Sequence, residues 1–287
     1  MQNLLLTIEY DGAGFHGWQK QPRVRTVQGE LEVALSAVCR AELSVCGASR
    51  TDAGVHAYGQ RASFGGDFGI PVEGLVRAVN NLLGCGLAEA SARGGPAAGR
   101  PPGIGKPGDL RVKAALRVPG GFHARYDATG KKYIYRILST PQTDIFLRNA
   151  CWQTAETLDA EAMRAAARHI VGTRDFGAFQ SAGGHVRKTT VRTVHSLDIK
   201  TEPAGEGRRM TVVEIAGDGF LYNMVRIIAG TLVLAGIGRM DPEDVRRAVE
   251  SCDRRKAGPT APPQGLYLAE VYYREHALDA YSQAPRA

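Results

Sequence analysis

Long apolar stretches are absent from the sequence. A membrane-spanning helix needs roughly 20 consecutive apolar residues, and the longest candidate, residues 224–237, is interrupted by Arg226 and by glycine, so it predicts a buried core helix. Cysteine is also scarce, and its five residues, an odd number with no two close in sequence, indicate neither a disulfide framework nor a zinc site. Scattered, reduced thiols are typical of cytoplasmic proteins, and we expect a cytoplasmic location.

The rest of the composition is that of a globular protein with an excess of positive charge. Its 287 residues are 44% hydrophobic and 23% charged, so the chain can bury a core. At about 150 residues per domain, this length indicates two domains or one domain of two halves. Lysine and arginine number 36 against 29 aspartate and glutamate, and the net charge of +7 favours a polyanionic partner such as nucleic acid.

Hydrophobic periodicity predicts a mixed α/β chain. Alternating apolar residues indicate strands over residues 4–10, 61–64, 133–138, 194–200, 210–215 and 265–273. Apolar residues at helical spacing indicate helices over residues 27–39, 72–83, 159–171 and 220–237. Thr26 is the expected N-cap of the first helix, and Asp241 followed by Pro242 is expected to begin a further one.

The two halves have similar composition, which indicates an internal duplication. We expect an N-terminal lobe over residues 1–115 and a C-terminal lobe over 116–275, followed by a flexible tail at 276–287. Residues 84–107 are rich in glycine, alanine and proline and lack apolar periodicity, which predicts a disordered insertion. A G-x-G-x-x-G pattern at 103–108 does not indicate a nucleotide site, because the prolines around it leave no strand before it and no helix after it.

One segment is dense in reactive and polar side chains. Residues 48–57 are A-S-R-T-D-A-G-V-H-A, without the periodicity of a core element. The segment is compatible with a polar turn in which Asp52 closes the loop, Gly54 supplies a positive φ and Arg50 is solvated. It is also compatible with a catalytic loop in which Asp52 is a nucleophile or base and Arg50 holds a phosphate or the carboxylate itself. The residues alone leave both interpretations open.

The same segment resembles the catalytic motif of the TruA family of tRNA pseudouridine synthases, A-G-R-T-D-A-G-V-H. Other segments resemble further motifs of that family in the same order: Y-D-G-A-G-F-H-G-W-Q at 10–19, F-H-A-R at 122–125, K-K-Y-I-Y at 131–135, N-M-V-R at 223–226 after Phe220, and G-L-Y-L at 265–268. Together they span nearly the whole chain. The sequence departs from the family pattern at Ser49, where glycine is usual, and at the 84–107 insertion.

The resemblance implies an α/β (α+β) protein with the pseudouridine synthase fold. This fold has two similar lobes, each an antiparallel sheet with helices on one face, around a central cleft. The activity it implies is the isomerisation of uridine to pseudouridine at positions 38, 39 and 40 of the tRNA anticodon arm, without cofactor or metal. It also implies a homodimer in which one tRNA contacts both subunits.

The resemblance also implies roles for single residues. Asp52 would act on the target uridine, either at C1′ or through a glycal route at C2′, while the bond to N1 breaks and the base rotates and rejoins through C5. Arg226 matches the arginine that pairs with this carboxylate and keeps it ionised. Tyr133 matches the tyrosine that stacks on the target base. Arg50 and His56 are expected to hold the RNA backbone or to fill the space that the base vacates.

Two other functions are compatible with parts of the sequence. A non-catalytic RNA-binding protein or RNA chaperone on the same fold would have no need to keep Asp52, Tyr133 and Arg226 together. A carboxylate hydrolase that uses Asp52 with Asp11 lacks a spaced acid partner and a metal site that could activate water.

Basic residues occur in four clusters that we expect to form the RNA surface, with an affinity that falls as salt rises. These clusters are Lys20, Arg23 and Arg25; Lys131 and Lys132; Arg187, Lys188 and Arg192; and Arg246, Arg247, Arg254, Arg255 and Lys256.

Overall fold

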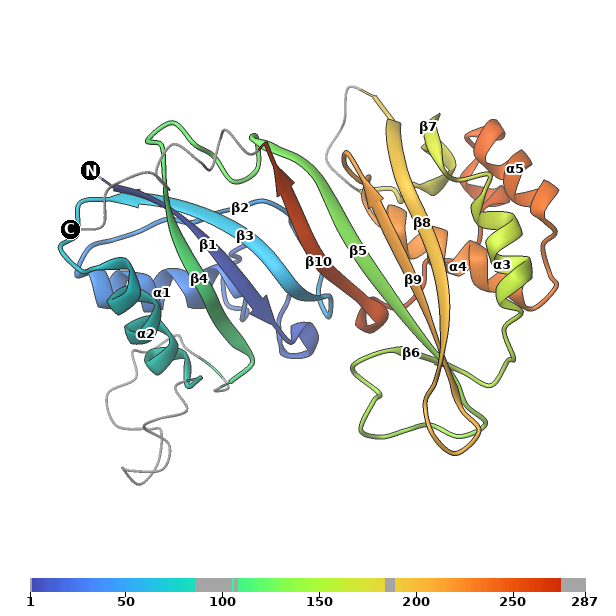
Figure 1. Ribbon diagram of the computed structural model, residues 1–287, viewed down its shortest axis with the longest axis horizontal. Coiled ribbons are helices and arrows are strands. Elements are labelled where there is room, and N and C mark those ends of the chain that lie inside the picture. Colours follow the sequence, from blue (N-terminus) through green and yellow to red (C-terminus); the bar gives the residue numbers. More distant parts are fainter. Residues whose placement is uncertain (1, 86–104, 106–107, 184–188, 275–287) are drawn as a thin grey trace. The chain divides into compact units, whose positions relative to one another are not determined.

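The computed structural model describes residues 2–85, 105, 108–183 and 189–274. They form a mixed α/β protein whose strands pair mostly in antiparallel fashion (Figure 1). Two compact units are present: unit 1 comprises the described residues up to Thr129 and from Leu268 onward, and unit 2 is Gly130–Tyr267. Apart from Gly84, Cys85 and Gly105, the predicted insertion lies outside the described residues, as does the predicted tail.

The sheet of unit 1 has the strand order β4-β1-β3-β10, and the two-residue strand β2 pairs with β3. Strand β1 is antiparallel to both β3 and β4, and its Leu4, Leu5 and Leu6 are completely buried, as expected for a central strand. The strands are β1 (Gln2–Tyr10), β2 (Cys46–Gly47), β3 (His56–Gly66), β4 (Leu110–Val118) and β10 (Leu266–Tyr273). The expected lobe boundary at residue 115 falls inside β4.

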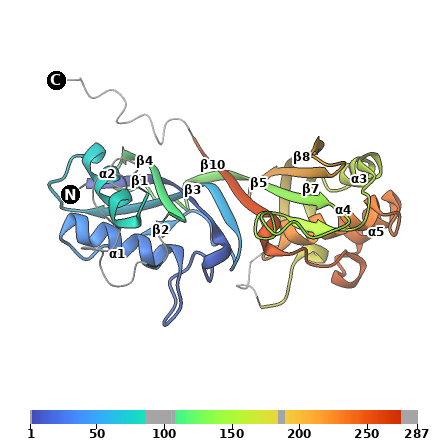
Figure 2. The same cartoon turned by 90° about the horizontal axis from the view of Figure 1, so that it is seen from below.

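Two helices complete unit 1. Helix α1 (Val27–Cys39) begins where the sequence predicted, with the Thr26 hydroxyl accepting a hydrogen bond from the Gly29 backbone N–H, and Figure 2 shows α1 along one face of the sheet. Helix α2 (Val72–Leu83) packs against α1 and β4. Its Asn80 side chain accepts from the backbone N–H of Val112 at 2.9 Å and donates to the Val112 carbonyl at 2.8 Å, so an amide side chain covers part of this sheet edge.

The strands of unit 2 follow the order β5-β9-β8-β7, and β6 is parallel to β5. Helix α4 lies in the core, where Ile227, Ile228 and Leu232 are at most 1% exposed, and α3 packs against α4, α5 and β8. The elements are β5 (Ala128–Ser139), β6 (Trp152–Thr154), α3 (Ala160–Ala167), β7 (Gly172–Asp175), β8 (Val191–Pro203), β9 (Arg209–Gly217), α4 (Met224–Gly236) and α5 (Pro242–Ser251).

Several boundaries differ from those predicted. The helix expected over 220–237 begins only at Met224, because Asn223 has a φ of 59° and therefore lies in the left-handed region, outside the helix. The helix expected over 159–171 ends at Ala167, and Asp159 is its N-cap. Most predicted strands are longer in the structure, as β3 is. In the described part of the chain, no helix is long and apolar enough to cross a membrane.

The cap of α1 gives a direct test of these helix boundaries. Thr26→Ala removes the hydroxyl that accepts from Gly29, at a position only 3% exposed, so we expect the free energy of unfolding in urea to fall by about 1 kcal/mol. Thr26→Ser keeps the hydroxyl and serves as the control, with a much smaller expected change. Equal losses for the two variants would show that the cap does not stabilise α1.

Candidate active site

The segment that carries Asp52 is a tight turn between β2 and β3 in unit 1. The backbone N–H of Val55 donates to the Asp52 carbonyl at 3.1 Å, and Gly54 has the positive φ, 79°, that the sequence predicted. Thr51 is buried, Asp52 is half-buried and Arg50 is exposed. The turn therefore holds Asp52 at the surface of unit 1 on a backbone of defined geometry.

A second segment, residues 10–18, is hydrogen-bonded to the backbone of this turn. The backbone N–H of Trp18 donates to the Thr51 carbonyl at 3.0 Å, and that of Gly54 donates to the Phe15 carbonyl at 3.3 Å. The Tyr10 hydroxyl lies 2.7 Å from the Thr51 hydroxyl, and both side chains are buried. Two motifs some distance apart in sequence thus form one hydrogen-bonded structure around Asp52.

Glycine is required where these two segments meet. A Cβ at position 12 would lie 2.0 Å from the Val55 carbonyl oxygen, and one at position 17 would lie 2.7 Å from that of Thr51. Gly17 also has a φ of 85°, which side chains disfavour. Gly12 and Gly17 of the 10–19 motif are therefore explained by close backbone approach to the Asp52 turn.

Ser49 departs from the glycine usual in the TruA family without backbone strain. It does not have a positive φ. The side chain of Gln60, which is completely buried, accepts from the Ser49 backbone N–H at 3.2 Å and donates to the Ser49 carbonyl at 2.7 Å. This pairing fixes the backbone before Arg50, and because φ at position 49 is not positive, a Cβ there causes no backbone strain.

His56 is buried beneath the turn. Its Nδ1 accepts from the Gly12 backbone N–H at 3.0 Å and lies 3.1 Å from Asp11 Oδ1. A nitrogen that accepts a hydrogen bond carries no proton, so the Asp11 contact is not an ion pair while the bond from Gly12 is made. Asp11 Oδ1 in turn accepts from the Ala13 backbone N–H, which caps the short 3₁₀ helix η1 (Gly12–Gly14). His56 therefore joins the 10–18 segment to the start of β3.

Arg25 is an internal ion-pair partner, which corrects its expected place on the RNA surface. Its Nε lies 2.6 Å from Glu30 Oε1 and its Nη1 2.6 Å from Asp109 Oδ2, and the guanidinium carbon lies 4.0 Å from the centre of the Phe15 ring. Burial alone would lower the pKa of Arg25, but the hydrogen bonds to Asp109 and Glu30 outweigh it and raise that pKa. Arg25 connects α1, the start of β4 and the 10–18 segment.

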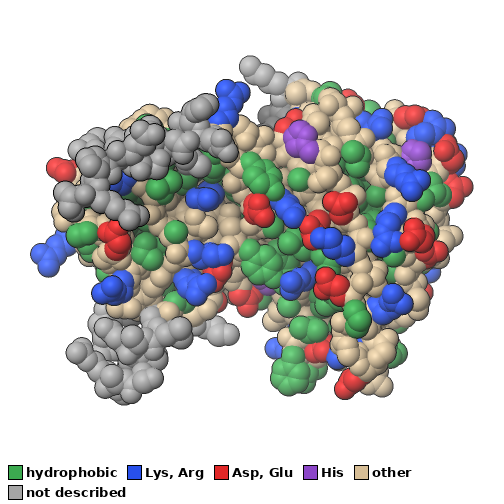
Figure 3. Space-filling view, in the orientation of Figure 1, with side chains coloured by type: hydrophobic (Ala, Val, Ile, Leu, Met, Phe, Trp, Pro, Cys, Tyr) green, Lys and Arg blue, Asp and Glu red, His purple; other side chains and the backbone are tan. Residues whose placement is uncertain are grey.

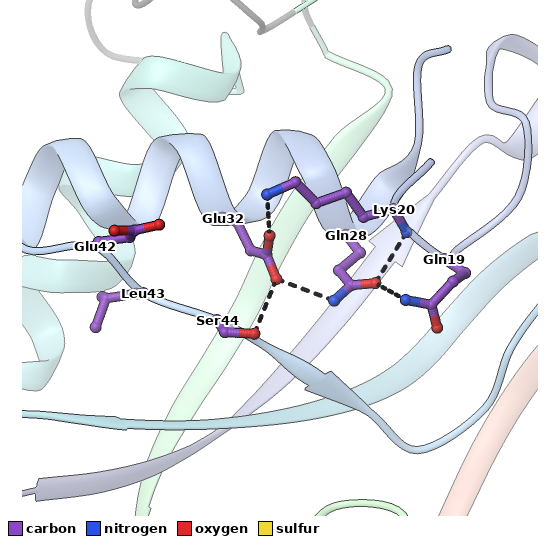
Figure 4. A pocket seen from close by; sticks show the side chains of 7 residues that line it. All are labelled: Gln19, Lys20, Gln28, Glu32, Glu42, Leu43 and Ser44. Atoms are coloured by element: carbon purple, nitrogen blue, oxygen red, sulfur yellow. Dashed lines mark hydrogen bonds and ion pairs between the residues drawn. The ribbon is translucent and has the colours of Figure 1, made fainter. Parts of the chain in front are cut away.

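Other predicted RNA-contact residues are also ion-paired. Lys20 Nζ lies 2.9 Å from Glu32 Oε2 in an open pocket of about 610 Å³, and Figure 4 shows the Lys20 side chain directed toward that carboxylate.

Three arginines of α5 and of the turn after it also form ion pairs with acidic side chains. Arg246 pairs with Glu243 and Glu250, Arg247 with Asp244, and Arg255 with Asp253. Figure 3 shows blue and red side chains interspersed on unit 2. Arg187 and Lys188 lie outside the described residues.

Tyr133 and Tyr135 lie on the inner face of β5 in unit 2, as the alternation of the strand predicted. Tyr133 pairs with Ile215 across the sheet, is 7% exposed, and receives the Phe220 ring edge-on at a centroid distance of 5.2 Å. The Tyr135 hydroxyl donates to the Pro262 carbonyl at 2.7 Å, and burial raises the pKa of Tyr135. Phe220 therefore fixes the plane of the Tyr133 ring.

Arg226 is held in the first turn of α4. Its Nε donates to the Ala261 carbonyl at 2.7 Å and its Nη1 to Asn223 Oδ1 at 2.8 Å, while the Arg226 carbonyl accepts from the Ala261 N–H at 3.1 Å. Asn223 Nδ2 donates to the Ser181 hydroxyl at 3.1 Å. The half-buried guanidinium is thus oriented by two acceptors and is not a mobile surface group.

The predicted site residues form two groups. Arg50, Asp52 and His56 come from the turn of unit 1 and the start of β3, and Tyr133 and Arg226 come from unit 2, where Phe220 and Asn223 orient them.

The sequence did not predict the supporting roles of Gln60, Thr51 and Asn223. Asn223 stood inside a recognised motif, whereas nothing in the local pattern distinguished Gln60.

Comparison with known sequences gives the class of the protein. A sequence model described as tRNA pseudouridine synthase matches residues 6–93 and 166–274. The tRNA pseudouridine synthases A of Ruminiclostridium cellulolyticum and Acetivibrio thermocellus are each 41% identical over 273 residues, which is 95% of this chain and all of each relative. The one from Citrifermentans bemidjiense is 41% identical over 276 residues, 96% of this chain and 99% of the relative. This chain therefore belongs to the tRNA pseudouridine synthase A family.

The Arg25 ion pairs give a testable consequence for stability. Arg25→Gln leaves Glu30 and Asp109, whose side chains are 3% and 11% exposed, without their shared counter-charge, so we expect the free energy of unfolding to fall by about 3 kcal/mol. The measurement is urea denaturation at neutral pH.

Lys20→Gln is the matched control for loss of a single positive charge from the same segment. Its ion pair with Glu32 involves a lysine side chain that is 63% exposed, so the expected loss is below about 1 kcal/mol. Equal losses for the two variants would contradict a structural role for Arg25.

Proposed function

We propose that this protein converts uridine to pseudouridine at positions 38, 39 and 40 of the tRNA anticodon arm, with Asp52 as the reacting carboxylate. Membership of the tRNA pseudouridine synthase A family supplies the reaction, the isomerisation of uridine in tRNA. The observation that supports Asp52 is its place on a half-buried turn whose backbone is hydrogen-bonded on both sides of it to the 10–18 segment. Such anchoring reduces the motion available to a reacting group.

The reaction breaks one bond and forms another within a single nucleotide, so it is neutral in electrons and needs no cofactor. In one route the Asp52 carboxylate bonds to C1′ while the bond from C1′ to N1 breaks and uracil leaves with the electron pair. In the other, the Asp52 carboxylate removes the C2′ proton as uracil leaves, which gives a glycal. In both, uracil turns and C5 bonds to C1′. This breaks the bond between Asp52 and C1′ in the first route, and in the second the proton returns to C2′. The proton on C5 is then lost and N1 takes up a proton.

Arg226 and Tyr133 have complementary roles in this proposal. A guanidinium beside the carboxylate favours its ionised form, and Arg226 is already oriented by Asn223 and Ala261. Tyr133, its plane fixed by Phe220, offers an aromatic surface on which a detached uracil can turn while it is retained. The proposal requires Arg226, Tyr133 and Asp52 to act on the same nucleotide.

The remaining parts of the proposal concern RNA and assembly. Arg50, exposed on the turn, contacts the RNA backbone or fills the space left by the target base, and His56 supports it from the buried side of the turn. The protein acts in the cytoplasm as a homodimer, with each tRNA contacting both subunits.

The alternative from another class is a non-catalytic RNA-binding protein on the same fold. It predicts tRNA binding without turnover. The hydrolase that would use Asp52 with Asp11 is disfavoured because Asp11 caps η1 and contacts His56, and so serves the structure of the turn.

Asp52→Asn separates catalysis from binding. We expect no pseudouridine in unmodified tRNA incubated with this variant, because an amide can neither attack C1′ nor carry the negative charge that the reaction needs, while tRNA affinity stays nearly unchanged. Chemical mapping of pseudouridine along the tRNA and a filter-binding titration measure the two quantities.

Asp11→Asn is the matched control, since it removes a carboxylate nearby but keeps an oxygen that accepts from Ala13. It should retain activity. Turnover by Asp52→Asn near the parent rate would refute the assignment, and absence of pseudouridine with the parent protein would favour the non-catalytic alternative.

A further inference from the structure

Tyr126 is an exposed aromatic residue on an ordered turn of unit 1. The turn, residues 122–127, follows β4 and leads into β5, and the Tyr126 residue is 77% exposed. An aromatic side chain usually stabilises a protein by being buried, and an exposed one contributes little in this way. The exposure of Tyr126 therefore indicates a role other than packing.

Hydrogen bonds within the turn hold its backbone in place. The backbone N–H groups of Tyr126 and Asp127 both donate to the His123 carbonyl at 3.1 Å, and the Arg125 N–H donates to His123 Nδ1 at 3.1 Å. The His123 N–H donates to Asp127 Oδ2 at 2.7 Å. Four of the five backbone N–H groups of residues 123–127, all but that of Ala124, thus form hydrogen bonds within the turn.

The turn is also anchored to the core of unit 1. Ala124 is completely buried, its N–H donates to the Ser63 hydroxyl at 3.0 Å, and its carbonyl accepts from the Tyr273 hydroxyl at 2.7 Å. The Phe122 ring packs on the Tyr273 ring at a centroid distance of 5.2 Å. The residues on either side of His123 therefore fix the turn to β3 and β10.

The Tyr126 ring lies against the ring of His123. Its centroid lies 4.2 Å from that of the His123 ring, with 35° between the planes. The imidazole thus supports the phenol ring from one side, while most of the tyrosine remains in contact with water. The ring is held ready for a partner, so little conformational entropy is lost when one binds.

The surroundings indicate the kind of partner. A specific protein interface covers about 800 Å² on each side, whereas the turn exposes one large aromatic side chain among the polar residues His123, Arg125 and Asp127. A nucleobase matches one aromatic ring in size, and the turn carries a cation, Arg125, in a chain of net charge +7. The Asp127 carboxylate, the opposing charge in the turn, is engaged by the His123 N–H.

We infer that the Tyr126 ring, supported by His123, stacks on an unpaired nucleobase of the tRNA substrate. This inference rests on the proposed function, since it takes tRNA as the ligand. It adds a contact in unit 1 that depends on the aromatic face and only weakly on charge.

Three substitutions at this position test the inference. Tyr126→Ala removes the ring and Tyr126→Leu replaces it with an aliphatic group, so both should raise the Kd for unmodified tRNA by about fivefold or more. Tyr126→Phe keeps the ring and should leave the Kd within about twofold of the parent value. Because stacking releases no counterions, the slope of log Kd against log salt should be the same for all four proteins. Thermal unfolding confirms that each variant is folded.

The results that would overturn this inference differ from those that would contradict the proposed function. If the parent protein forms pseudouridine and Tyr126→Ala binds tRNA as tightly as the parent does, the inference is overturned and the proposed function stands. If Tyr126→Phe weakens binding as much as Tyr126→Ala, the hydroxyl and not the ring is responsible, which also overturns it. A parent protein that forms no pseudouridine contradicts the proposed function itself.

Discussion

The backbone hydrogen bonds between residues 15–18 and 51–54 are the constraint on which the rest of the site depends. They connect two loops whose chains approach so closely that a Cβ at Gly12 would overlap the Val55 carbonyl. Backbone bonds of this kind have little freedom to rearrange, in contrast to bonds between long side chains. Tyr10, His56 and Gln60 then fix the turn from its buried side. The Asp52 carboxylate, which the proposed function makes the reacting group, is therefore positioned by the fold of unit 1.

Much of the fold follows from local patterns in the sequence. The start of α1 at Thr26 and that of α5 at Asp241 were predicted from capping residues, because a cap acts within three or four residues of chain. Strands β6 and β7 were missed because three or four residues are too few to show alternation. From Leu268 onward, β10 belongs to unit 1, although the chain before it belongs to unit 2. No local pattern in the sequence reveals this change of unit.

The same limit applies to the site. Turn chemistry predicted the positive φ of Gly54, and strand alternation predicted that Tyr133 lies on the same face of β5 as Tyr135. The role of Asp52 stays a prediction. The prediction for Arg25 was wrong. Its basic neighbours in sequence had placed it on the RNA surface. Its partner Asp109 is distant in the chain, so only the folded structure shows that the charge is already balanced. Gln60 was overlooked for the same reason, since it bonds the backbone of Ser49, which lies in the loop after β2.

The pairing of basic residues changes how the positive charge of this protein is understood. The ion pairs of Arg25 stabilise the protein itself, and the exposed pairs of Lys20 and of the arginines of α5 occupy further cations with little gain in stability. Net charge therefore overstates the number of cations that face a phosphate backbone. The proposed function then assigns more of the recognition of tRNA to shape and to aromatic contacts such as that inferred for Tyr126. The Arg226 guanidinium is likewise already bound, by backbone and amide oxygens.

The most direct test is a crystal structure of the Asp52→Asn protein bound to unmodified tRNA. The account predicts a uridine of the anticodon arm turned out of its stack, with its C1′ within about 3.5 Å of the side chain at position 52 and its base against the Tyr133 ring. It also predicts that the 10–18 segment and the 48–55 turn keep their mutual hydrogen bonds. A bound uridine whose sugar lies beyond reach of position 52, with that turn unchanged, would contradict it.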